Sequence, residues 1–129
     1  MTIEEINDEI RKINDYLEMC LWMDFEFAQM DGGNIVVAGR IDTSIYEFAI
    51  NIEFELPYYI SSLSHWHLDD SKLFIELLEG DEMWAISNKY HVEKGNHIFR
   101  INAENFEEAP IIIASHGLRC EIVDEHPFS

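Results

Sequence analysis

Residues 45–56 read I-Y-E-F-A-I-N-I-E-F-E-L, and this stretch decides the fold that we expect. Large apolar side chains alternate in it with small or polar ones, and the apolar series is Tyr46, Phe48, Ile50, Ile52, Phe54 and Leu56. A period of two is typical of a strand with one buried face and one solvent face. The sequence therefore predicts one long central strand, with Glu47, Glu53 and Glu55 on its solvent face.

A helix is predicted ahead of this strand, at the start of the chain. Thr2 and Glu5 have the spacing of a capping box, in which each side chain bonds the backbone N–H of the other residue. Isoleucines and a leucine then recur every three or four residues. We expect an amphipathic helix over residues 2–19 that packs on the sheet and shows a mainly acidic face to water.

Two further strands are predicted between this helix and the long strand. From residue 21 onward, apolar side chains alternate with Asp24 and Glu26, so these two carboxylates should lie on the solvent face. Residues 31–34 read D-G-G-N, which is typical of a tight hairpin turn, and residues 35–41 should return as the partner strand. A second turn over residues 40–44 then leads into the long strand, which gives a three-stranded antiparallel meander.

The second half of the chain is predicted to add strands to the same sheet. Pro57 ends the long strand because proline cannot donate to a ladder, and residues 57–71 follow no regular pattern. Strands are expected at residues 72–78, 83–90, 97–102, 111–114 and 118–123, with turns at 79–82 and 93–96. The predicted fold is a single α+β domain over residues 1–123, with the N-terminal helix packed on a largely antiparallel sheet of seven or eight strands in meander order. Residues 124–129 should form a loose tail.

Charge is the most unusual property of the chain. Its 129 residues include 26 acidic and 8 basic ones, for a net charge of -18 at pH 7. Such a field repels phosphate, so direct binding of nucleic acid or of an anionic membrane surface is not expected, whereas a basic protein would be attracted. The alternative is that the acidity only keeps the protein soluble.

Compartment and thiol chemistry follow from composition. No run approaches the roughly 20 apolar residues that cross a bilayer, and the acidic start differs from a secretion signal, so a cytoplasmic location is expected. Cys20 and Cys120 match no metal-ligand spacing. They are predicted to be free thiols, because disulfides are scarce in the cytosol.

One motif offers metal chemistry, the sequence His65-Trp66-His67. On a strand the two imidazoles would face the same way, and Asp69 or Asp70 could add oxygen ligands. No further ligand stands at a recognisable spacing. The favoured interpretation places Trp66 inward and both histidines outside, near an edge or a partner surface, and we expect no cofactor.

No motif for nucleophilic, nucleotide or dinucleotide chemistry is present, so the chain is not expected to be an enzyme. The candidate binding residues are instead carboxylates and aromatic side chains. The predicted partner-binding set is Asp24, Glu26, Glu47, Glu53, Glu55, Tyr58, Tyr59 and Trp66. Its three aromatic residues could be interface anchors or core residues.

A short, strongly acidic α+β domain without a catalytic motif resembles the small immunity proteins that bacteria pair with polymorphic or contact-dependent toxins. The resemblance is one of size, charge and architecture. It implies that carboxylates neutralise a basic toxin or nuclease domain by occluding its active site. Three alternatives stay open: a phage-encoded inhibitor of a host enzyme, a structural or adaptor domain, and a small metal-dependent enzyme centred on His65 and His67.

Overall fold

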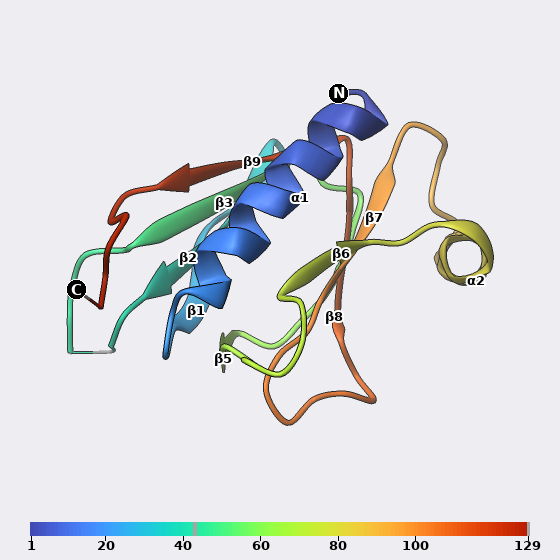
Figure 1. The fold of residues 1–129 in the computed structure, drawn as a ribbon. Helices are drawn as coiled ribbons and strands as arrows, with labels where there is room; N and C mark the ends of the chain where they lie inside the picture. Colours follow the sequence, from blue (N-terminus) through green and yellow to red (C-terminus); the bar gives the residue numbers. More distant parts are fainter. Residues whose placement is uncertain (43, 129) are drawn as a thin grey trace.

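The computed structural model describes residues 1–42 and 44–128, which form two antiparallel sheets and two helices (Figure 1). The first sheet has the order β5-β1-β2-β3-β9, and its strands are β1 (Asp24–Met30), β2 (Asn34–Arg40), β3 (Ile50–Glu55), β5 (His65–His67) and β9 (Gly117–Ile122). The second sheet has the order β4-β8-β7-β6, and its strands are β4 (Tyr59–Ser61), β6 (Ile75–Leu77), β7 (His97–Ile101) and β8 (Ile111–Ser115). The helices are α1 (Ile3–Glu18) and α2 (Gly80–Tyr90).

The predicted α+β class, with an N-terminal helix and antiparallel strands, is confirmed, but the single meander sheet is wrong. The nine strands of the described residues are divided between two sheets. The last strand, β9, pairs with β3 and not with β8, which precedes it in the chain. Between β8 and β9 the backbone N–H of His116 donates to the carbonyl oxygen of Glu55 at 2.9 Å, where the chain crosses to the first sheet.

The long central strand predicted over residues 45–56 is also wrong in its bounds, because only Ile50–Glu55 is a strand. Before it, the backbone N–H of Ile45 donates to the carbonyl oxygen of Asp42, which forms a turn; Thr43 of the predicted 40–44 turn lies outside the described residues. After it, Leu56 takes a φ of 48°, and its backbone N–H donates to the carbonyl oxygen of Gly33 at 2.9 Å. Within β3 the predicted alternation holds, since Ile50, Ile52 and Phe54 are buried. Tyr46 and Leu56, expected inside, are exposed.

The strand predicted at 83–90 and the turn predicted at 79–82 are both replaced by α2. Met83, Ile86 and Tyr90 stand three and four residues apart, and the first two pack on the second sheet. In this short apolar stretch the same residues fit both the period of a strand and that of a helix, so periodicity alone cannot distinguish the two. The neighbouring prediction at 72–78 shortens to β6, while the irregular 57–71 segment contains β4 and β5.

Helix α1 forms where it was predicted, and its capping box is present. The backbone N–H of Glu5 donates to Thr2 Oγ1 at 3.1 Å, and that of Thr2 donates to Glu5 Oε1 at 2.9 Å. The helix lies beside both sheets, in contact with β9 and β6 (Figure 1). Its buried residues are Ile6, Ile13, Tyr16 and Leu17. α1 therefore closes the core on the side where the two sheets meet.

The main core lies between the inner faces of the two sheets. Phe54 of the first sheet meets Phe99 of the second, with their ring centroids 5.5 Å apart. A smaller cluster lies beneath α2, on the other face of the second sheet. Within the described residues, neither helix packs on the outer face of the first sheet, and the segment before β3 covers it only at Arg40. No helix in the described chain combines the length and apolarity needed to span a membrane.

The predicted tail begins as an ordered segment. The backbone N–H of Asp124 donates to the carbonyl oxygen of Ala49 at 3.1 Å, and the Tyr16 hydroxyl donates to the carbonyl oxygen of Asp124 at 2.5 Å. These bonds hold the chain after β9 against the last turn of α1. Ser129, the end of the predicted tail, lies outside the described residues.

Asn14 joins α1 to β6 through a paired hydrogen bond. Its side-chain amide donates to the Ile75 carbonyl oxygen at 2.9 Å and accepts from the Ile75 backbone N–H at 3.1 Å. We expect Asn14→Ala to lower the free energy of unfolding by about 2 kcal/mol, because it leaves both partly buried backbone groups unpaired. Urea unfolding measures this, with Asp15→Ala, an exposed change on the same helix, expected within about 0.5 kcal/mol of wild type. Equal losses in the two variants would contradict the role of Asn14.

Candidate functional site

The structure brings four of the five predicted carboxylates onto one surface, the outer face of the first sheet. Asp24 and Glu26 on β1, and Glu53 and Glu55 on β3, alternate with buried residues and point away from the core. β2 lies between the two strands, and its register sets Glu26 level with Asn51 of β3, so the two carboxylate pairs are separated by about 10 Å across the sheet and by a further offset of about 13 Å along the strands. Glu47 lies outside the strands, in the exposed segment before β3.

Three of these carboxylates already have a partner within the chain. Glu26 forms an ion pair with Arg40 at 3.0 Å, Glu55 forms one with Arg119 at 2.6 Å, and Asp24 Oδ1 shares a hydrogen bond with His67 Nδ1 at 2.5 Å. The side chains of Glu53 and of Glu121 on β9 make no ion pair or hydrogen bond within the described residues. With neutral histidines, five carboxylates face two guanidinium groups, so the face is negative overall.

The sequence reasoning missed Arg119 and the approach of the histidines to Asp24 and Glu26. Arg119 reaches Glu55 because β9 pairs with β3, and β5 pairs with β1 so that His67 lies opposite Asp24 and His65 opposite Glu26. Both pairings join segments about 40 or more residues apart in the chain. Alternation in β9 could have placed Arg119 on an outer face, but not beside Glu55.

A cavity of about 280 Å³ opens on this face at the β5 edge. Its polar lining is Asp24, Glu26, Arg40, Ser64, His65 and His67. Ser64 Oγ lies 3.0 Å from His65 Nδ1, whereas the carboxylate of Asp24 pairs with His67. The serine and the carboxylate therefore contact different histidines, and the geometry is that of two separate pairs rather than a nucleophile, base and orienting acid in series.

The metal hypothesis gains no third ligand from the fold. Within residues 1–42 and 44–128, no three His, Cys, Asp or Glu side chains are grouped so that they could hold one ion. His65 and His67 are exposed on β5 as expected, with Trp66 turned inward. His67 is engaged by Asp24, and Asp69 and Asp70 belong to a different hollow.

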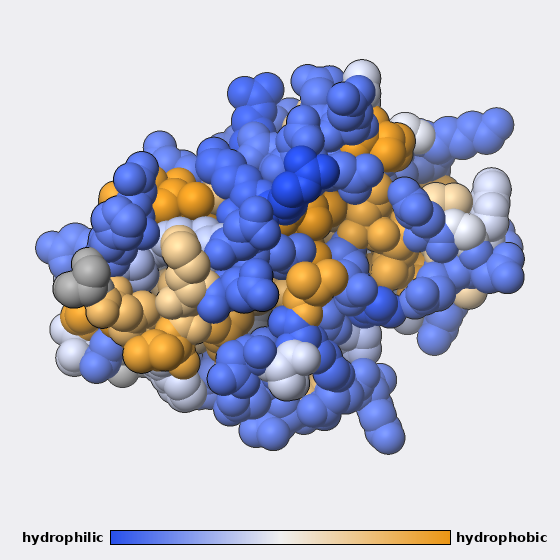
Figure 2. Space-filling model, viewed as in Figure 1, coloured by the Kyte–Doolittle hydropathy of each residue, from blue (hydrophilic) through white to orange (hydrophobic). Residues whose placement is uncertain are grey.

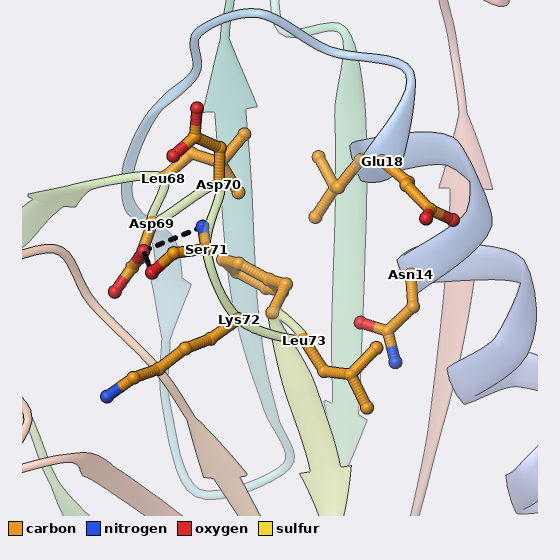
Figure 3. Close-up of a pocket in the computed structure, with 10 residues that line it drawn as sticks. Asn14, Glu18, Leu68, Asp69, Asp70, Ser71, Lys72 and Leu73 are labelled. Carbon is orange, nitrogen blue, oxygen red and sulfur yellow. Dashed lines mark hydrogen bonds between the residues drawn. The ribbon is translucent and has the colours of Figure 1, made fainter.

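That second hollow, of about 230 Å³, lies between α1 and residues 68–74 (Figure 3). Asp69 Oδ1 accepts from the Ser71 hydroxyl at 2.5 Å and from the Ser71 backbone N–H at 2.9 Å, and these bonds lower the pKa of the Asp69 carboxyl. Figure 3 shows the carboxylates of Asp69 and Asp70 pointing in different directions. Asp69 thus fixes a turn, and the two acids do not converge on a ligand.

The three aromatic candidates do not join the acidic face. Tyr58 donates its hydroxyl to the carbonyl oxygen of His91 at 2.8 Å, and the Tyr59 ring stacks on Tyr90 at 4.3 Å, so both lie beside α2 on the second sheet. Trp66 is only 3% exposed and its ring packs against the rings of Phe25 and Phe27. Of the two roles left open for Trp66, the structure shows the core one.

An aromatic residue predicted for the core instead lies at the rim of this face. The Arg40 guanidinium carbon stands 4.3 Å from the Phe48 ring centroid and 6.0 Å from that of Tyr46. Tyr46 is 86% exposed. The segment before β3 therefore folds over Arg40 and holds that cation beside Glu26, with a free phenol ring at the edge.

The two cysteines are core residues and are free, as predicted. Burial raises the pKa of each thiol to about 11. Because the thiolate is the reactive form, neither group is available as a nucleophile at neutral pH.

Comparison of the chain with protein-family models, curated proteins and solved structures gave no match. The chemistry of the surface is therefore the basis for assigning a function.

Proposed function

We propose that this chain is an acidic protein-binding inhibitor of the immunity type. It binds a cationic toxin or nuclease domain with the outer face of its first sheet and occludes the active site of that domain. The proposal depends on two features of the chain. Carboxylates outnumber basic groups, which gives a net charge of -18, and five of these carboxylates have fixed positions on a sheet face that no helix covers.

The charge supports fast and selective encounter with a basic partner. A net field of this size attracts a cationic surface over a distance of about a Debye length and repels nucleic acid that would compete for the same partner site. Electrostatic attraction of this kind raises the association rate more than it raises affinity, and salt weakens it.

The sheet supports the geometry of binding. β1 and β3 are held on both sides by hydrogen-bonded neighbours, so their outward carboxylates keep their spacing without ordering a loop. The side chains of Glu53 and Glu121 are unpaired, so they can accept hydrogen bonds from a partner's lysine or arginine without first breaking an internal ion pair. Glu55 can exchange its partner as well, since the Arg119 side chain is 69% exposed and such pairs contribute little to stability.

The proposal is tested by capture followed by inhibition. The full chain, immobilised, is incubated with lysate of the organism that encodes it, and the retained protein is identified and purified. We expect a cationic protein whose catalytic activity is lost at one equivalent of inhibitor. Its association rate should fall by about tenfold or more between 50 and 500 mM salt.

A matched pair of variants tests the location of the site. Glu53→Gln with Glu121→Gln removes two charges from the sheet face, and Glu107→Gln with Glu108→Gln removes two from the exposed loop beside the second sheet. The first variant should associate about threefold or more slowly, and the second should stay close to wild type. Equal slowing would contradict the sheet face as the site. Capture of no cationic protein, or binding without inhibition, would contradict the function.

A further inference from the structure

Four large apolar side chains are exposed in the two segments where α1 ends and where the chain leaves β9. They form what we call the anchor patch, Met19 (61% exposed), Leu21 (77%), Trp22 (41%) and Val123 (55%). The hydrogen bond from the Tyr16 hydroxyl to the Asp124 carbonyl oxygen joins the last turns of α1, next to Met19, to the segment that carries Val123, whereas Trp22 extends the patch toward the β5 edge, where it meets His67. Figure 2 shows apolar side chains gathered on this side, between the C-terminal end of α1 and the C-terminus. In soluble monomeric proteins, a group of large exposed apolar side chains often marks an interaction site.

The surroundings of the anchor patch are acidic. Asp15 and Glu18 come from the last turns of α1, and Asp124 and Glu125 follow Val123. Neither residues 13–39 nor residues 120–129 contain a lysine or arginine. Two cations of other segments lie nearby: Lys72, which lines the hollow of Figure 3 with Glu18, and Arg40, which is held by Glu26. The two segments that carry the patch thus bring four carboxylates and no lysine or arginine of their own.

The anchor patch is continuous with the outer face of the first sheet. The Trp22 ring centroid lies 4.8 Å from that of His67, and His67 is paired with Asp24 on β1. A partner seated on the sheet face at the β5 edge would therefore also reach Trp22. Tryptophan at the centre of an interface commonly contributes a large share of the binding energy.

We propose that the anchor patch is the apolar centre of the partner interface. It takes a cationic protein surface on which one or two apolar side chains are flanked by lysine or arginine. This inference rests on the proposed function and deepens it. Charge complementarity selects this occupant over a second copy of the chain, because pairing two such patches would bring eight carboxylates together on molecules of net charge -18.

Site-specific photo-cross-linking tests the surface directly. The full chain carries p-benzoylphenylalanine either at Leu21 or at Trp84, an exposed residue of α2 on the opposite sheet. Both proteins are irradiated in lysate of the encoding organism. We expect the Leu21 probe, and not the Trp84 probe, to cross-link the cationic protein that is captured and inhibited by wild type. Cross-linking of a second copy, or equal cross-linking from both positions, would overturn the proposal.

Affinity for the purified partner gives the second measurement. Leu21→Ala with Trp22→Ala should weaken binding by about 30-fold or more, whereas Trp84→Ala should change it by less than about threefold. Circular dichroism and thermal melting establish that all variants are folded. If the partner binds and is inhibited but the double variant binds as wild type does, the anchor patch proposal is wrong and the proposed function stands. If no cationic partner is found, both are wrong.

Discussion

Phe54→Ala is expected to lower the free energy of unfolding by about 3–5 kcal/mol, the usual cost of truncating a fully buried phenylalanine. Phe54 is inaccessible to solvent, and its ring meets Phe99 across the two sheets at 5.5 Å. Removing it leaves a cavity at the point where the inner faces meet, and the close packing around it cannot fill that space without distortion. Urea unfolding followed by circular dichroism measures the loss.

Tyr46→Ala is the matched control, because both aromatic residues belong to the same alternating series in the sequence. Tyr46 is exposed, and its one described contact is the approach of Arg40 to its ring at 6.0 Å. Its removal should therefore change stability by no more than about 0.5 kcal/mol. Similar losses in the two variants would mean that the strand continues through residue 46, contrary to the structure.

Trp66→Ala is expected to cost about 3–5 kcal/mol as well. The indole packs against Phe25 and Phe27 and holds the short edge strand β5 on β1. Trp66→Phe should cost less, because the Nε1 atom of Trp66 makes no hydrogen bond within the described residues and the replacement keeps an aromatic ring in the core. Thermal melting and urea unfolding of the two variants test the ranking.

Trp22→Ala separates binding from folding in the same experiment. Its indole is 41% exposed in the anchor patch, so the variant should remain within about 1 kcal/mol of wild type while losing affinity for the partner. A large loss of stability in Trp22→Ala, or little loss in Trp66→Ala, would reverse the assignment of the two tryptophans to surface and core.

The ion pairs on the sheet face have a consequence for how a partner would bind. The Glu26–Arg40 and Glu55–Arg119 pairs are partly exposed, so each contributes no more than about 1 kcal/mol to stability. A partner's cation can therefore take the place of an internal one without a large cost in folding energy.

The sequence by itself determined the local features that depend on neighbouring residues. The capping box at Thr2 and Glu5 and the amphipathic spacing after it are sufficient to specify α1. Alternation correctly placed Asp24 and Glu26 on one face of β1 and Glu53 and Glu55 on one face of β3, because a strand presents successive side chains to opposite sides. The acidity that motivates the proposed function is likewise a property of composition alone.

Only the tertiary structure decided which strands are neighbours, and with them the site. The division into two sheets depends on pairings between distant segments, such as β9 with β3. Such a pairing requires closing a long loop, at a cost in chain entropy, and it produces no pattern in the local sequence that could predict it. The same pairings place Arg119 beside Glu55 and His67 beside Asp24. The contact of α1 with residue 124, which joins two of the segments that carry the anchor patch, is also a contact between residues 108 positions apart in the chain. Periodicity records which way a side chain points, whereas the surface it belongs to depends on segments distant in sequence.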